Sequence, residues 1–197
     1  PHLAYNPSAH LAIVDIVLGV ADILPIHGFG YLVPRNATNN SDEILGVIFD
    51  SDAVPNQSQR LTKLTVMMGG PYWRHRSSFP NEDDVKERAL RALHSQLGLS
   101  LLTLTSHLEN IYARVMTDTI PQYLVGHPQR MAELKAAIKM HPQWRNRLSL
   151  LGYSYGGVGV NDCIANAMDT CDAICNYEQN KSPLSDTSGL QPALFPG

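Results

Sequence analysis

The spacing of apolar residues changes near residue 80, and this change constrains the fold more than any other feature of the chain. Before it, short apolar runs occupy residues 11–19, 29–33, 44–49 and 61–70, with segments dense in Asn, Ser, Asp and Pro between them. Apolar runs of this length, bounded by turn-forming residues, are typical of strands. We therefore expect an antiparallel sheet of about four strands in the first part of the chain.

Helical spacing dominates after residue 80. Acidic residues fill the first turn of a helix predicted over residues 81–98, apolar residues recur along one face, and a glycine stands where a helix often ends. The apolar residues and the glycine are Val85, Ala89, Leu93, Leu97 and Gly98. The same reasoning predicts a second helix over residues 128–140, and short strands over residues 101–105 and 112–116.

A glycine-rich segment, residues 152–159, follows a short apolar run at residues 148–151 and precedes a third helical pattern. The predicted order is strand, turn and helix, and the N–H groups at such a helix start can bind an anion or a cofactor. Close packing of helix on sheet explains the glycines equally well, so both readings stay open on the pattern alone. The predicted buried face of this helix comprises Val160, Cys163, Ile164, Ala167, Met168, Cys171 and Ile174.

The segment also contains GYSYG at residues 152–156, which fits the G-x-S-x-G nucleophile elbow of hydrolases. In that class the catalytic histidine follows the serine along the chain. No histidine follows Ser154, because the last one is His141. A serine hydrolase would therefore lack its general base.

Charge and composition argue against several other classes. The net charge of −3 and the absence of a basic stripe give no support to nucleic-acid partners. Apolar runs are too short for a membrane-spanning helix, and the histidines lack metal-ligand spacing, so we expect no metal site. Three cysteines in one short stretch favour reduced, buried thiols. His27 and His127 stand beside glycines, where a structural hydrogen-bonding role is the commoner one.

Five segments together resemble the C-terminal half of the protoporphyrinogen oxidases, in the same order. The resemblance extends over about residues 11–170. The segments are HGFGYLVP at residues 27–34, LGVIFDS at 45–51, LTVMMGG at 64–70, IPQY with GH at 120–127, and GVGVNDCI at 157–164.

The resemblance implies an α+β and α/β architecture, the C-terminal portion of an amine-oxidase-like FAD fold. Residues 1–110 would form part of a substrate-binding domain, and residues 111–176 would return to the FAD-binding domain and supply its last strand and helix. Residues 177–197 are expected to be a flexible tail. Because no G-x-G-x-x-G fingerprint follows a strand, we expect the FAD-binding N-terminal half to be missing and the chain alone to be inactive.

The resemblance also assigns residues to sites. The residues implied at the flavin are Val115, Gly157, Val158, Gly159, Val160, Asn161 and Asp162. Those implied at the substrate are Phe29, Leu32 and Met67. No side chain is expected to act as a catalytic acid or base, since the chemistry belongs to the cofactor.

The implied activity is oxidation of protoporphyrinogen IX to protoporphyrin IX through FAD, with oxygen as acceptor, in haem biosynthesis. A mitochondrial inner-membrane location, peripheral membrane association through parts outside this chain, and a homodimer are further implications. Two alternatives stay open: a related flavin amine oxidase or desaturase with another substrate, and a non-enzymatic tetrapyrrole-binding domain.

Overall fold

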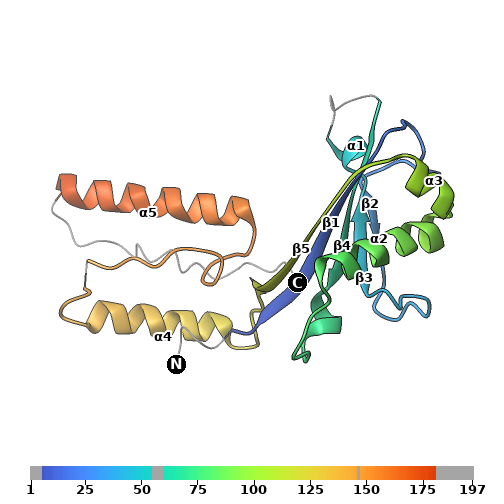
Figure 1. The fold of residues 1–197 in the computed structure, drawn as a ribbon. Helices are drawn as coiled ribbons and strands as arrows, with labels where there is room; N and C mark the ends of the chain where they lie inside the picture. Colours follow the sequence, from blue (N-terminus) through green and yellow to red (C-terminus); the bar gives the residue numbers. More distant parts are fainter. Residues whose placement is uncertain (1–5, 55–59, 146, 181–197) are drawn as a thin grey trace. The chain divides into compact units, whose positions relative to one another are not determined.

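The computed structural model describes residues 6–54, 60–145 and 147–180 (Figure 1). The chain divides into two compact units. The first, here called the sheet unit, is formed by residues 9–119, and the second, the helical unit, by residues 1–8 together with 120–197. Assignment of these units to a substrate domain and a flavin domain stays a prediction.

The sheet unit is built on five strands in the order β2-β3-β4-β1-β5. Neighbouring pairs β1–β4, β3–β4 and β2–β3 run antiparallel, as expected from the short apolar runs and turn-rich connections. The strands are β1 (Ser8–Leu18), β2 (Gly30–Leu32), β3 (Ile44–Ile48), β4 (Thr62–Gly69) and β5 (Leu108–Pro121).

One face of this sheet forms the core of the sheet unit. Alternate residues of β1 and β4 are buried, because successive side chains of a strand point to opposite faces. Helix α2 (Glu82–Leu97) packs its apolar residues into the same core cluster. Full burial of each large apolar side chain contributes about 1.5–3 kcal/mol. The largest of them are Trp73, Phe49, Ile16, Leu18, Ile44 and Leu64.

Both ends of α2 follow from local sequence. The Asn81 side chain accepts a hydrogen bond from the backbone N–H of Asp84, and the Asp84 side chain accepts one from the Asn81 N–H. This capping box satisfies N–H groups that have no acceptor within the helix. At the other end Gly98 adopts a left-handed conformation with φ of 73°, which ends the helix. The predicted helix is confirmed.

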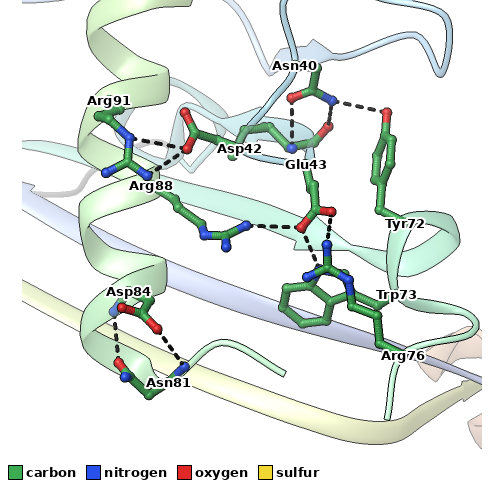
Figure 2. Close-up of polar contacts among 11 residues, drawn as sticks. Asn40, Asp42, Glu43, Tyr72, Trp73, Arg76, Asn81, Asp84, Arg88 and Arg91 are labelled. Atoms are coloured by element: carbon green, nitrogen blue, oxygen red, sulfur yellow. Dashed lines mark hydrogen bonds and ion pairs between the residues drawn. The ribbon is translucent and has the colours of Figure 1, made fainter. Parts of the chain in front are cut away.

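The partly buried carboxylate of Glu43 binds a loop to this helix (Figure 2). Glu43 accepts hydrogen bonds from Trp73 Nε1 at 2.9 Å, from Arg88 Nη1 at 3.0 Å and from the Arg76 guanidinium. Its φ of 61° is uncommon for a residue with a side chain. The three donors explain why a glutamate occupies this left-handed position, and they join the loop before β3, the turn η1 (Gly70–Trp73) and α2.

Several expected elements differ. Residues 101–105 are not a strand but belong to helix α3 (Leu101–Ser106), because the Ser100 hydroxyl caps the Thr103 N–H and Leu104 is buried. Residues 148–151 are irregular instead of a strand. Strand β5 is much longer than the predicted residues 112–116. Residues 50–53, which the sequence predicts as part of a connection between strands, form helix α1 (Asp50–Ala53).

The helical unit contains α4 (His127–Met140) and α5 (Val160–Asn180). Residues on α4 form a small cluster with Leu150 and Tyr155, and these are Met131, Leu134 and Ile138. The predicted buried face of α5 is wrong in large part within this unit: Val160, Ile164, Met168, Cys171 and Ile174 are exposed, while Asn166 and Thr170 are buried. Residues 177–180 are helical, and the remainder of the predicted tail, residues 181–197, lies outside the described residues.

Candidate functional site

Tyr123 ties the glycine-rich segment together at two points. Its hydroxyl oxygen accepts a hydrogen bond from the Gly157 N–H at 2.9 Å. The same hydroxyl donates to the backbone carbonyl of Tyr153. Burial raises the pKa of Tyr123 above its ordinary value and outweighs the opposite effect of the Gly157 N–H. The phenol therefore keeps the proton that it donates.

His127 supports the same segment from the first turn of α4. Its ring stacks on Tyr123 with centroids 3.9 Å apart, and only 5% of the residue is exposed. Its Nε2 lies 3.1 Å from the Tyr155 carbonyl oxygen, and its Nδ1 lies 3.3 Å from the Asn6 amide nitrogen. Because a carbonyl only accepts, the geometry assigns the imidazole proton to Nε2 and makes Nδ1 the acceptor for Asn6. Both ring nitrogens are thus engaged.

Asn6 extends these contacts by one residue. Its amide nitrogen is also 3.5 Å from the Ser154 carbonyl oxygen. Consecutive carbonyls of Tyr153, Ser154 and Tyr155 are therefore each approached by a side-chain donor. The Asn6 Oδ1 atom is buried and finds no hydrogen-bond partner among the described residues.

The turn before α5 is shaped by Asp162. Its carboxylate accepts a hydrogen bond from the Gly159 N–H at 3.2 Å, in the manner of an acidic residue three positions after a helix N-cap. A Cβ atom at Gly157, whose φ is 142°, would approach the Asp162 Cβ to 2.6 Å. The Asp162 side chain therefore requires glycine at position 157. The first hydrogen bond of α5 runs from the Cys163 N–H to the Gly159 carbonyl at 3.1 Å.

This turn leaves a defined set of groups for a ligand. The Gly157 N–H and the Asp162 carboxylate are engaged within the turn. N–H groups in the first turn of a helix, here those of Val160 and Asn161, have no acceptor within the helix. Val158 and Val160 are 51% and 75% exposed. The ring of a flavin is planar and carries carbonyl oxygens along one edge. N–H donors beside apolar side chains suit such an edge, so Val158, Val160 and Asn161 fit a flavin.

Six of the seven predicted flavin residues come together in this turn, Gly157 to Asp162. The seventh, Val115, lies on β5 and packs half-buried against the core of the sheet unit. Tyr123, His127 and Asn6 were missed as parts of the site. Tyr123 and His127 lie in the IPQY and GH segments of the resemblance, and His127 stands beside Gly126, but neither signal assigned them to this site.

The predicted substrate residues lie together in the sheet unit. The register pairs Leu32 with Gly46, and Gly46 with Met67, so the three follow one row across β2, β3 and β4. Leu32 is 80% exposed, and Met67 alternates with buried neighbours, so both face away from the core. A Cβ atom at Gly46 would meet the Leu32 Cδ2 atom at 3.0 Å. Phe29, just before β2, is 73% exposed.

A hydrogen-bonded pair, His27 and Asp52, joins the loop before β2, which contains Phe29, to α1. The His27 Nδ1 lies 3.1 Å from Asp52 Oδ2, and the Gly28 N–H donates to the same oxygen at 3.0 Å. The hydrogen bond from Gly28, with His27 adding to it, holds the pKa of Asp52 below its ordinary value. The pair fixes the loop that leads into Phe29, and it was not foreseen from the sequence because its members are distant in the chain.

Other site classes find little support in the described residues. No group of three or more His, Cys, Asp and Glu side chains among them could hold a metal ion. Within the same residues, no helix combines the length and apolar character needed to cross a membrane. The expectation of buried thiols is wrong for Cys171 and Cys175, which are exposed, while all three cysteines are free.

The hydrolase alternative loses its structural context. A nucleophile elbow places the serine on a sharp turn between a strand and a helix. The residues before Ser154 are irregular, and α5 begins six positions after it, at Val160. His127 binds the Tyr155 carbonyl and Asn6 through its two ring nitrogens.

Comparison with solved structures finds a known fold that contains this chain. A crystal structure of a candidate protoporphyrinogen oxidase from Exiguobacterium sp. 255-15 matches 86% of this chain and 35% of its own, with a TM-score of 0.67 and 23% identity. The fold is therefore part of an amine-oxidase-like fold. No protein-family model matches the chain.

Sequence comparison finds relatives that share one name. The chain is 34% identical over 180 residues to protoporphyrinogen oxidase from Schizosaccharomyces pombe. The aligned residues are 90% of this chain and 35% of the relative. Protoporphyrinogen oxidases of Macaca fascicularis and Homo sapiens are each 33% identical over 162 residues, 80% of this chain and 32% of theirs. The chain is thus related by descent to the protoporphyrinogen oxidases, and it spans about a third of the length of these relatives.

Proposed function

We propose that this chain is the part of a protoporphyrinogen oxidase that contacts the flavin and the porphyrinogen. The observation that carries the proposal is the sequence relationship to enzymes of that name over 80–90% of the chain. The reaction would be oxidation of protoporphyrinogen IX to protoporphyrin IX with oxygen as acceptor, in haem biosynthesis. The N-terminal part that binds the rest of FAD would be supplied by sequence that this chain does not contain.

The turn from Gly157 to Asp162 would hold the flavin ring of FAD. When bound, FAD would accept the hydrogens removed from the substrate. The N–H groups of Val158, Val160 and Asn161, with the positive end of the α5 dipole, would stabilise negative charge on a reduced ring. Val115 would provide a further, apolar contact.

The row of Leu32, Gly46 and Met67 would receive the tetrapyrrole. A flat apolar macrocycle can lie on exposed apolar side chains, and the absence of a side chain at Gly46 lets the exposed Leu32 side chain lie close over β3, next to Met67 in the same row. Phe29 would pack on the ring beside them. Positioning and exclusion of water would then be the contribution of these residues to catalysis.

The remaining proposals concern location and assembly. By relation to the eukaryotic enzymes, the full protein would act at the mitochondrial inner membrane and associate with it peripherally through parts outside this chain. Assembly as a homodimer is proposed on the same basis. Submitochondrial fractionation of the full-length protein would test the location.

Val160→Asp in the full-length protein tests the flavin assignment. The position is 75% exposed and stands in the first turn of α5, where an acidic residue suits the helix dipole, so the fold should tolerate the change. A carboxylate beside the reduced ring should weaken FAD binding by about tenfold, or ~1.4 kcal/mol. Flavin absorbance per mole of purified protein and FAD titration of the apoprotein would measure this loss.

Ser154→Ala serves as the matched control in the neighbouring segment. Under the flavin proposal it should keep flavin content and turnover close to those of the unmodified protein, because a lost hydroxyl hydrogen bond costs about 0.5–1.5 kcal/mol. An unchanged FAD affinity of Val160→Asp in the titration would refute the placement of the ring at this turn. Loss of all turnover in Ser154→Ala with flavin retained would revive a nucleophilic serine.

A further inference from the structure

The glycine-rich segment has few means of its own to hold one shape. It contains no regular secondary structure, and Gly152 and Gly157 have φ values of 116° and 142°. Fixing the backbone of such residues in one conformation costs conformational entropy. The segment needs anchors if the N–H groups that follow it are to point in a fixed direction.

Side chains from outside the segment supply those anchors. The Tyr123 hydroxyl binds the Tyr153 carbonyl and the Gly157 N–H, and the His127 Nε2–H binds the Tyr155 carbonyl. The two rings stack almost parallel, at an interplanar angle of 6°. Each ring therefore restricts the other, and neither hydrogen bond can shift alone without loss of the stacking contact.

We propose that Tyr123 and His127 are positioning residues that pre-orient the ligand-facing N–H groups after Gly157 for the flavin. The inference rests on the proposed function. The Tyr123 hydroxyl fixes Gly157, and the next N–H along the chain belongs to Val158, a residue that is half exposed. N–H donors held in place before the ligand binds stabilise charge without reorganisation, which strengthens both binding of the ring and its negatively charged reduced form.

Direct contact between these side chains and a ligand is a poorer explanation. His127 is almost fully buried, and both of its ring nitrogens are occupied. The Tyr123 hydroxyl already donates once and accepts once. These groups have no free proton site for substrate chemistry, so they act through the backbone of the segment.

Tyr123→Phe in the full-length protein tests the proposal. Phenylalanine keeps the ring that stacks on His127 but removes the hydroxyl that binds Tyr153 and Gly157. We expect FAD to bind about tenfold more weakly and the midpoint potential of the bound flavin to fall, because the reduced ring loses oriented donors. FAD titration of the apoprotein and a spectroelectrochemical titration measure the two quantities. Tyr112→Phe, at an exposed tyrosine of β5, is the matched control and should change neither.

The outcomes separate this inference from the proposed function. If Tyr123→Phe binds FAD with unchanged affinity and potential while Val160→Asp loses it, the positioning role is wrong and the flavin turn stands. If the unmodified full-length protein binds no FAD, both ideas fail. Should Tyr123→Phe not fold, His127→Gln replaces it: glutamine retains an N–H donor for Tyr155 but loses the stacked ring. An unchanged flavin potential in that variant would also overturn the inference.

Discussion

At the residue scale, the described structure shows hydrogen-bond partners for polar side chains whose partners the sequence could not indicate. Asp52 is the acceptor for both His27 and Gly28, although 25 and 24 positions separate it from them. No periodicity or motif links such residues, because the pairing arises only when β2 and β3 bring the two loops together. His27 was noticed beside a glycine, but its partner could not be predicted.

The Asp52 contacts should depend on pH in a defined direction. A carboxyl whose pKa is lowered by folding stabilises the fold above its unfolded pKa of about 3.9, and this contribution is lost as pH falls through the lower folded pKa. We expect the Gly28 amide to exchange faster and to shift in an NMR titration below about pH 4. Asp52→Asn should abolish this inflection, and an inflection that survives the substitution would show that another group controls the loop.

At the element scale, the sequence predicts whether a segment is a helix or a strand better than it predicts which elements pack against each other. The caps of α2 lie within three residues of its ends, so the acidic first turn and Gly98 indicated its bounds, and the capping box of Asn81 and Asp84 is equally local. Residues 101–105 could suit either a strand or a helix, and the Ser100 cap decides for the helix. The apolar spacing of α5 correctly predicts a helix, but spacing cannot reveal which element covers its apolar side, and within the helical unit that side is exposed.

The Glu43 contacts yield a prediction about three elements joined at one carboxylate (Figure 2). Glu43→Gln keeps the shape of the side chain but removes the charge that binds Arg76 and Arg88. Since hydrogen bonds to charged groups contribute about 1.5–3 kcal/mol each, the free energy of unfolding should fall by roughly 1–3 kcal/mol. Urea denaturation followed by circular dichroism would measure the change.

Asp83→Asn is the matched control for that substitution. Asp83 also forms an ion pair, with Lys86 at 3.0 Å, but its side chain is 88% exposed. Pairs so exposed contribute about 0–1 kcal/mol. Equal losses for Glu43→Gln and Asp83→Asn would mean that the partly buried Glu43 carboxylate has no special part in holding β3, η1 and α2 together.

At the scale of the whole molecule, the resemblance of five segments in family order predicts that residues 157–162 contact the flavin, and this assignment stays a prediction. The sequence could not indicate which side chains hold the segment before these residues in place. Tyr123 and His127 act across 34 and 28 positions on Gly157 and Tyr155, and Asn6 acts across 148 positions on Ser154. Such contacts depend on the tertiary fold, which local patterns do not specify.

The two units differ in how much core they contain. Among the described residues, nineteen buried apolar side chains form the cluster of the sheet unit, whereas Met131, Leu134 and Ile138 form that of the helical unit. Apolar side chains on α5 stay exposed within the helical unit. Because burial of apolar area is the main force that offsets conformational entropy, the two units should differ in their ability to fold alone.

We therefore expect a polypeptide of residues 8–121, which contains all five strands, to unfold cooperatively in urea. A polypeptide of residues 120–180 should show a shallow, non-cooperative change, since three buried side chains contribute only about 5–9 kcal/mol against the ordering of the whole segment. Circular dichroism in the far and near ultraviolet would follow both. The whole chain, as the reference, should share the transition midpoint of residues 8–121. A cooperative transition for residues 120–180, or none for residues 8–121, would show that the larger core does not determine the stability of this chain.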